Sequence, residues 1–261
     1  MTTNFGTTDM SFNGGPLKLG DKTIEKTGIS IFDPVLCEIA YRWFSNKESI
    51  ILDPFAGGSV RGIVANKIGR NYVGIELRKE QVEANTEQGK RLCPNNEPLW
   101  INGDSCEMDA LLEKDFKCDL VFSCPPYADL EVYSDDPKDL SNMEYDEFLK
   151  AYKTIIQKAV NKLNDNRFIV WVIGEVRDKK GNYYNFVGDT ISSFLEAGAK
   201  YYNECILLNS AGTLPLRSGK IFLSGRKVGK MHQNVLVFLK GDAKKATEYC
   251  GEIEINLEEL S

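Results

Sequence analysis

The chain has 261 residues, of which 42% are apolar and 27% are charged, and its formal net charge is -6. This length suits one large α/β domain with a full hydrophobic core, whereas the acidic balance argues against a protein that coats nucleic acid without specificity. The apolar stretches, such as residues 168–173, fall far short of the roughly 20 residues of a membrane span, and no basic-then-apolar leader opens the chain, so we expect a cytoplasmic protein.

Residues 1–30 are rich in Gly, Thr, Asn and Ser without sustained periodicity, which predicts an irregular arm. Asp33-Pro34 has the form of an N-cap followed by proline at the first helical position, and the apolar spacing after it predicts a helix. From residue 49 onward, apolar runs alternate with helical patterns. Strands are expected at residues 49–53, 72–77, 99–104, 120–123, 167–176, 201–209 and 234–240, and helices at residues 59–68, 78–92, 107–112, 145–163 and 187–197.

This alternation predicts right-handed βαβ units and therefore a mostly parallel, doubly wound α/β sheet. We assign residues 31–241 to this domain and residues 242–261 to a C-terminal tail. Ligands of such sheets bind beyond the carboxyl ends of the strands. The long irregular connections should border that edge, and they are expected at residues 128–142, 177–186 and 210–232.

The seven cysteines are scattered, with no Cys-x-x-Cys pair, and His232 is the single histidine. A structural zinc site needs four such ligands in a compact pattern, which this sequence lacks. We therefore expect no bound metal and reduced thiols.

The first expected strand leads into a glycine loop, Asp53-Pro54-Phe55-Ala56-Gly57-Gly58. Glycines at this turn let the backbone approach a ligand closely, although any α/β protein needs glycines at its first strand-to-helix turn. Glu76 ends the next expected strand, where a carboxylate can accept hydrogen bonds from both hydroxyls of a ribose. Neither a dinucleotide fingerprint nor a P-loop is present, so the pattern favours another nucleoside cofactor.

The fourth expected strand ends in a proline loop, Cys124-Pro125-Pro126-Tyr127. Together the two loops resemble the Asp-Pro-Phe-x-Gly-x-Gly and Asp/Asn/Ser-Pro-Pro-aromatic motifs of amino-group (N6-adenine/N4-cytosine) DNA methyltransferases. The resemblance covers residues 30–241, and the whole is similar to small stand-alone DNA methylases often carried by bacteriophages, which would place it in the host cytoplasm. One departure is Gly58-Ser59, where the family more often has Ser-Gly or Thr-Gly.

The resemblance implies a Rossmann-like, seven-stranded sheet whose last strand is antiparallel, with S-adenosylmethionine as the cofactor. The glycine loop would wrap the methionine end of that cofactor. The residues that the family uses for cofactor binding correspond here to Phe32, Asp53, Pro54, Phe55, Gly57, Gly58, Glu76 and Asp104, with Phe32 and the Asp33-Pro34 segment lying over the cofactor. Asp104 would contact the adenine amine, and an N-cap for the following helix is an equally good interpretation.

The resemblance also implies a reaction at the exocyclic amine of adenine or cytosine, which is a poor nucleophile because its lone pair is delocalised into the ring. Acceptors must draw the amine toward tetrahedral geometry, and the carbonyl of Pro125 suits that task because the prolines fix its direction. Tyr127 would stack on the extruded base. Cys124 stands where the family has a stronger acceptor, unless Ser123, Asp104 or water takes over.

Two alternatives follow from Cys124. A thiolate can attack C6 of a pyrimidine and activate C5 for methylation, with Glu175 as the glutamate near N3. C5 enzymes, however, carry Pro-Cys in that order, which favours the amino-group reaction. A noncatalytic cofactor-binding homologue is the second alternative.

Residues 217–230 carry cations and no carboxylate, which points to phosphate binding, although an ordinary soluble hairpin with lysines would look alike. DNA is the expected partner; RNA or a free nucleotide is compatible with the same motifs. Residues 128–142 are acidic and are expected to be solvated. Tyr183, Tyr184 and Phe186 either stack on a nucleotide or cover the core. The cations expected to bind DNA are Arg217, Lys220, Arg226, Lys227 and Lys230.

Overall fold

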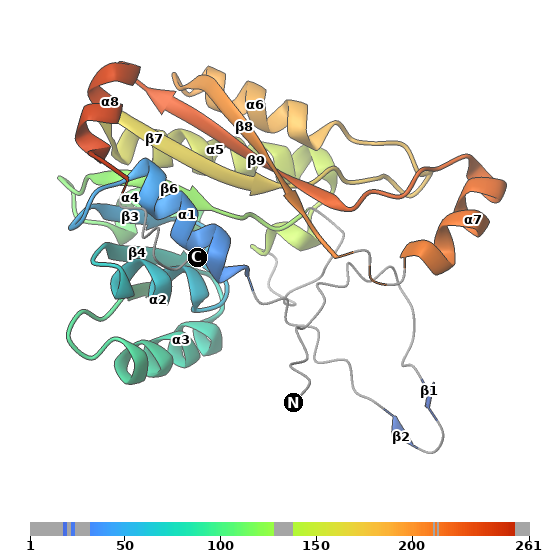
Figure 1. Ribbon diagram of the computed structural model, residues 1–261, viewed down its shortest axis with the longest axis horizontal. Helices are drawn as coiled ribbons and strands as arrows, with labels where there is room; N and C mark the ends of the chain where they lie inside the picture. Colours follow the sequence, from blue (N-terminus) through green and yellow to red (C-terminus); the bar gives the residue numbers. More distant parts are fainter. Residues whose placement is uncertain are drawn as a thin grey trace, which may run out of the picture.

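A seven-stranded sheet with the order β5-β4-β3-β6-β7-β9-β8 forms the centre of the computed structural model (Figure 1). Pairing is parallel from β5 through β7, whereas β9 is antiparallel to both β7 and β8. This confirms the predicted Rossmann-like sheet with its antiparallel last strand. The strands are β3 (Ile50–Asp53), β4 (Asn71–Glu76), β5 (Leu99–Asn102), β6 (Cys118–Ser123), β7 (Leu163–Ile173), β8 (Lys200–Leu208) and β9 (His232–Lys240).

The structure describes residues 18–19, 22–23, 32–127, 138–210, 212 and 214–253. Most of the expected arm at residues 1–30 therefore lies outside the described residues, apart from a two-stranded pair formed by β1 (Lys18–Leu19) and β2 (Lys22–Thr23). Residues 128–137 of the expected acidic connection also lie outside them. Within the described ranges, no helix is both long and apolar enough to span a membrane.

Helices cover both faces of the sheet because β7, in the middle of it, is apolar on both sides. Phe168 and Val170 point into the core shared with α1, α2 and α8, while Ile169 and Trp171 point into the core shared with α4, α5 and α6. The helices are α1 (Pro34–Phe44), α2 (Val60–Lys67), α3 (Lys79–Leu92), α4 (Met108–Leu111), α5 (Tyr145–Lys162), α6 (Phe186–Glu196), α7 (Leu214–Gly225) and α8 (Ala243–Cys250).

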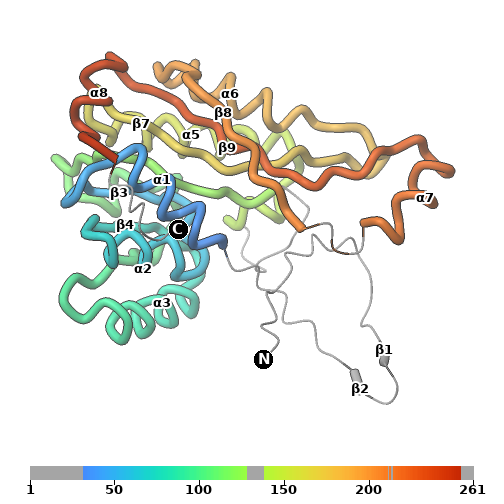
Figure 2. Tube along the Cα trace, in the orientation of Figure 1, coloured from blue at the N-terminus to red at the C-terminus, as the bar shows by residue number. Residues whose placement is uncertain are grey.

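Two segments differ from the sequence-based expectation. Residues 210–232 were expected to be irregular, but they contain α7, which buries none of its residues and lies apart from the helices that cover the sheet (Figures 1 and 2). Gly219 and Gly225 interrupt the pattern that would have indicated this helix. The expected tail at residues 242–261 begins with α8, which packs on β7 and α1 through Ala246.

Candidate functional site

The carboxyl ends of the parallel strands β3, β4, β5 and β6 lie at one edge of the sheet, and each leads into one of the expected site segments. The glycine loop follows β3, Glu76 ends β4, Asp104 follows β5 and the proline loop follows β6. The parallel topology therefore gathers the residues expected to bind the cofactor with those expected to meet the substrate.

The glycine loop is held against the end of β4. The Gly57 backbone N–H donates to Glu76 Oε2 at 2.9 Å, and the Ala56 N–H donates to the carbonyl of Ile75 at 3.0 Å. Asn85 Nδ2 of α3 donates to the Gly57 carbonyl at 2.7 Å. Gly57 itself has a φ of +52°, a conformation that glycine adopts without the strain of a side chain. The loop thus has a fixed shape built around Glu76.

Glu76 keeps part of its hydrogen-bonding capacity. Its Oε1 accepts the Arg78 N–H at 2.9 Å, so each carboxylate oxygen receives one backbone donor. Burial raises the pKa of Glu76, against the lowering effects of the Arg78 backbone and guanidinium and of the Gly57 N–H. An ionised carboxylate has about four acceptor positions. Two of them therefore stay available for hydroxyl donors of a ligand.

Asp53 is enclosed rather than ligand-facing. Its side chain is 0% exposed, and Oδ2 accepts from Arg61 Nε at 2.6 Å and from the Tyr72 hydroxyl at 2.8 Å. Oδ1 accepts from the Phe55 N–H at 3.1 Å and from Ser123 Oγ at 2.5 Å. Burial, and then the Asp53 carboxylate, raise the pKa of Tyr72 well above its usual range, so the phenol stays a neutral donor. The Asp53 carboxylate was expected to contact the cofactor, but its hydrogen bonds all come from other residues of the protein.

Arg61 extends this buried network in α2. Its guanidinium donates to the carbonyls of Phe55 and Ala56 and lies 4.7 Å from the centre of the Phe32 ring. Phe32 also packs edge-on against Phe122 at the end of β6. The network therefore connects the glycine loop to the segment before α1.

Ser123 links the two loops. It ends β6, is 0% exposed and donates its hydroxyl hydrogen to Asp53. The sequence left open whether Ser123 replaces the missing acceptor at Cys124. Since the hydroxyl is buried under the glycine loop, it supports that loop instead of facing the site.

The proline loop lies between the two cores of the domain. Cys124 packs against the side that contains α1, and Tyr127 packs against the side that contains α5 and α6. The Tyr127 ring meets Phe186 edge-on, with centroids 6.4 Å apart, and its hydroxyl lies 3.8 Å from Cys124 Sγ. Pro125 is buried, whereas Cys124, Pro126 and Tyr127 are half-buried. The loop is anchored and still accessible.

Asp104 adopts the capping role that the sequence allowed. Its Oδ1 accepts the Cys106 N–H at 2.8 Å at the start of the turn Ser105–Glu107, and its carboxylate also interacts with the Cys106 thiol. The neighbouring Ser105 was not identified from the sequence. Its hydroxyl donates to the Pro54 carbonyl at 2.6 Å and so joins this turn to the glycine loop.

Glu175 has a structural task. Its two carboxylate oxygens accept the N–H groups of Phe186 and Val187 at 3.2 and 3.3 Å, at the first turn of α6. A carboxylate at a helix N-terminus satisfies unpaired donors and interacts favourably with the helix dipole. The Glu175 carboxylate is thus directed at the start of α6.

The expected DNA-binding cations separate into groups. Arg217 and Lys220 are exposed on α7, and the Arg226 guanidinium lies 5.1 Å from the Phe222 ring centre. Lys230 differs: burial lowers its pKa, while the carboxylates of Glu175 and Glu204 act in the opposite direction. Residues 217–230 contain no carboxylate, but the fold brings two carboxylates, those of Glu175 and Glu204, toward Lys230.

Across the ranges that the structure describes, no three His, Cys, Asp or Glu side chains group in a way that would hold a metal ion. The site chemistry described above comes from carboxylates, backbone groups, prolines, aromatic rings and one thiol.

Comparisons with known proteins find relatives of the part of the chain that contains the glycine loop. Residues 37–87, from α1 through most of α3, match the family model described as DNA methylase. The type II methyltransferase M.HinfI of Haemophilus influenzae is 32% identical over 77 residues, covering 28% of this chain and 21% of that protein. The type II methyltransferase M1.MboII of Moraxella bovis is 37% identical over 65 residues, covering 25% of each chain. The chain thus matches about a quarter or less of each relative.

Solved structures share the fold over a larger part of the chain. TrmN from Thermus thermophilus has a TM-score of 0.53 at 12% identity, covering 79% of this chain and 48% of that protein. A methyltransferase from Pyrococcus furiosus has a TM-score of 0.51 at 16% identity, covering 80% of this chain and 83% of that protein. At these identities the likeness establishes the methyltransferase fold.

Proposed function

We propose that this chain, which belongs to the amino-group (N6-adenine/N4-cytosine) DNA methyltransferase family, transfers a methyl group from S-adenosylmethionine to the exocyclic amine of adenine or cytosine in DNA. The observation that carries the proposal is the hydrogen bond between Ser123 and Asp53. It fixes the base of the proline loop against the base of the glycine loop. A methyl donor on one loop and an amine on the other then meet at the same edge of the sheet. A bacteriophage-type enzyme in the host cytoplasm stays a prediction.

The residues of the glycine loop fit the proposed cofactor. When bound, S-adenosylmethionine supplies an electrophilic methyl group on a positively charged sulfur. The two spare acceptor positions of Glu76 suit the two ribose hydroxyls, and the backbone of Pro54 to Gly58 surrounds the methionine end. A Cβ at Gly58 would have no neighbour within 4 Å, so the chain's own packing does not explain a glycine there. By the family resemblance, Asp104 would contact the adenine amine and Phe32 would cover the site.

The proline loop acts on the amine of the substrate. The Pro125 carbonyl accepts a hydrogen bond from one N–H of the amine. This bond helps to direct the nitrogen lone pair away from the aromatic ring and toward the methyl group. Pro126 fixes the direction of that carbonyl, and Tyr127 stacks on the extruded base. Cys124 stands at the second acceptor position with a thiol, a weak acceptor. We therefore expect Cys124→Ser to keep or increase the rate of transfer.

C5 methylation through Cys124 is disfavoured by the position of Glu175. That mechanism needs a glutamate whose carboxylate can turn toward N3 of the pyrimidine, whereas the Glu175 carboxylate is directed at the first turn of α6, where it accepts two backbone N–H groups. Withdrawing the carboxylate would leave two helix donors unpaired, which costs about 1 to 3 kcal/mol for each buried group.

The test is mass spectrometry of nucleosides from DNA incubated with the protein and S-adenosylmethionine carrying a labelled methyl group. Labelled N6-methyladenine or N4-methylcytosine is expected, with wild type and with Cys124→Ser. Labelled 5-methylcytosine, together with loss of transfer in Cys124→Ser and a covalent adduct on 5-fluorocytosine DNA, would overturn the proposal. Parallel reactions on RNA and on free nucleosides establish whether DNA is the preferred substrate.

A further inference from the structure

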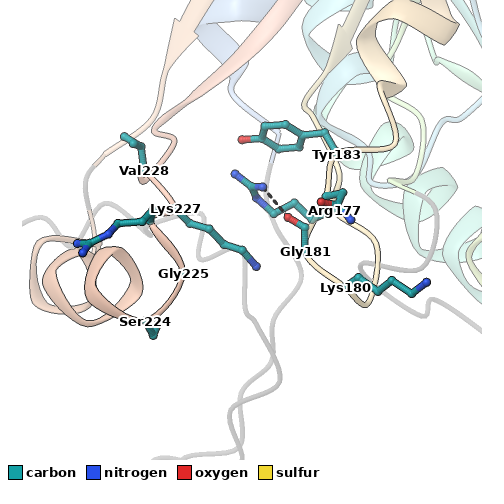
Figure 3. A pocket seen from close by; sticks show the side chains of 10 residues that line it. Arg177, Lys180, Gly181, Tyr183, Ser224, Gly225, Lys227 and Val228 are labelled. Atoms are coloured by element: carbon teal, nitrogen blue, oxygen red, sulfur yellow. Dashed lines mark hydrogen bonds between the residues drawn. The ribbon is translucent and has the colours of Figure 1, made fainter.

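A pocket of about 770 Å³ lies between two connections that leave the carboxyl edge of the sheet (Figure 3). One wall is the hairpin at residues 177–183, which follows β7. The other wall is the segment 224–228, at the end of α7. These connections are more than 40 positions apart in the sequence. The second carries Arg226 and Lys227, which were expected to bind DNA, whereas in the first only Tyr183 was considered for nucleotide stacking.

The side chains that line this basic pocket include four cations and no carboxylate: Arg177, Lys180, Arg226 and Lys227. The one acidic residue of the hairpin, Asp178, does not line the pocket and is used within the turn, where its carboxylate accepts from the backbone N–H and the side-chain amide of Asn182. The pocket therefore concentrates positive charge on a protein whose net charge is -6. A local field of this kind attracts anions despite the overall balance.

The hairpin holds its cations in a defined geometry. Arg177 pairs with Tyr183 in an antiparallel bridge, and the Arg177 guanidinium lies 3.8 Å from the centre of the Tyr183 ring. Arg177 Nη1 also donates to the Gly181 carbonyl at 2.7 Å (Figure 3). An arginine fixed by stacking and one hydrogen bond keeps its other N–H groups for a ligand, and its planar fork matches phosphate oxygens.

Gly181 allows the two walls to approach each other. It has a φ of +90° at the end of a turn closed by its N–H bond to the Asp178 carbonyl at 2.9 Å. A Cβ at this position would overlap the Lys227 ammonium. The ammonium of one wall thus rests directly on the backbone of the other, and a side chain on Gly181 would displace it.

The hairpin is anchored beside the proline loop. Its base is closed by the Tyr184 N–H, which donates to the Val176 carbonyl at 3.0 Å, and the chain then enters α6 at Phe186. Phe186 contacts the ring of Tyr127. The hairpin that forms one wall of the basic pocket is therefore joined through the buried start of α6 to the proposed base-binding loop.

We infer that the basic pocket binds backbone phosphates of the DNA strand whose target base enters the proline loop. This inference rests on the proposed function. It adds Arg177 and Lys180 to the DNA-binding residues and joins them to Arg226 and Lys227 in a two-walled phosphate clamp. Phosphate contacts position a protein on the duplex without reading its sequence. The clamp holds the strand, and sequence discrimination is left to other contacts.

The test measures binding of a fluorescent DNA duplex as a function of salt concentration, in the presence of S-adenosylhomocysteine. Lys180→Ala and Lys227→Ala are each expected to weaken binding by about three- to tenfold at low salt and to reduce the slope of log Kd against log salt by about 1. The double variant should lose both contributions. Lys179→Ala is the matched control, because Lys179 lies in the same hairpin but faces Glu144 at 3.9 Å and does not line the pocket.

Equal affinities and slopes for wild type, Lys180→Ala and Lys227→Ala would overturn the clamp, as would an equal loss in Lys179→Ala. Nucleoside analysis separates the two proposals. Methylated DNA with unchanged binding in the lysine variants refutes the clamp alone, whereas clamp-dependent binding without methylated product refutes the proposed reaction alone.

Discussion

Asp53, at the base of the glycine loop, has no exposed surface and accepts four hydrogen bonds. By contrast, α7 buries none of its residues; it lies on the part of the same sheet edge that is proposed to face the DNA, here called the target side. Leu216 of that helix is 86% exposed, and Leu223 is 77% exposed. The base of the glycine loop is therefore buried and held by a polar network inside the domain. The target side is supported by few internal contacts.

This difference fits two kinds of ligand. A small cofactor is bound best by a site that is already in its final shape, because little ordering is needed on binding. A long polyanion is held by separated surface cations, and each contact contributes a little. Changes in the glycine-loop network should therefore alter stability, and changes on the target side should alter binding with little effect on the fold.

The largest expected effect is on stability, from Asp53→Ala. The substitution leaves the Arg61 guanidinium buried without its carboxylate, and breaking a buried ion pair costs about 3 to 5 kcal/mol. Urea denaturation measures the loss. Glu196→Ala, which removes the exposed partner of Lys153, is the control and should cost less than about 1 kcal/mol. A similar small loss in both variants would show that the glycine loop is not supported by this network.

The contrast between the two regions also explains what the sequence could predict. The positions of the strands along the chain, the glycine loop and the proline loop follow from local patterns, because apolar periodicity and glycine or proline positions act over a few residues. The buried partners Arg61 and Tyr72 were not anticipated. They lie 8 and 19 positions from Asp53, and nothing local indicates that three polar side chains of separate elements meet.

The target side was harder to predict for another physical reason. Helix α7 buries none of its residues and contains Gly219 and Gly225, which are weak helix formers and therefore argue locally against a helix. The hairpin and the end of α7 meet at Gly181, where a positive φ and the nearby Lys227 ammonium both disfavour a side chain, and neither is evident from the local sequence. Contacts between distant loops are set by the tertiary fold.

On the target side, Tyr127→Ala is expected to lower kcat/KM for DNA by the equivalent of about 1 to 3 kcal/mol, the usual contribution of an aromatic ring stacked on a base. Tyr127→Phe is the control, because it keeps the ring and its contact with Phe186 and removes only the hydroxyl near Cys124. Steady-state methylation assays measure both. Equal losses in the two variants would mean that the hydroxyl, and not the stacked ring, is required.

On the cofactor side, Glu76→Ala is expected to weaken binding of S-adenosylmethionine by about 1 to 3 kcal/mol, because two ribose hydroxyls lose their acceptors. Isothermal titration calorimetry gives the dissociation constant directly. Glu76→Gln, which keeps one acceptor oxygen, should lie between wild type and Glu76→Ala. An unchanged constant in Glu76→Ala contradicts the assignment.

Because the pKa of Glu76 is raised, both the folding stability and the cofactor affinity should depend on pH, and they should change in opposite directions. The folded protein holds this proton more tightly than the unfolded chain, so the contribution of Glu76 to stability is lost as pH rises through the folded pKa. Binding needs the ionised acceptor, so cofactor affinity should fall as pH falls through the same value, at a pH above that of an exposed glutamate. Calorimetric titrations between pH 7 and the acid range measure this, and Glu76→Gln should show a flatter profile.

The smallest expected effects on stability are those of alanine substitutions at two adjacent glycines, Gly57 and Gly58, and the two substitutions should differ. Gly57→Ala places a side chain at a φ of +52°, which costs about 1 to 2 kcal/mol. Gly58→Ala meets open space and should change stability by less than about 0.5 kcal/mol. If the Gly58 backbone lies against the cofactor, however, the added methyl group must weaken cofactor binding, by about 1 kcal/mol or more. A Gly58→Ala protein with wild-type stability and wild-type affinity would show that the methionine end does not lie against this part of the loop.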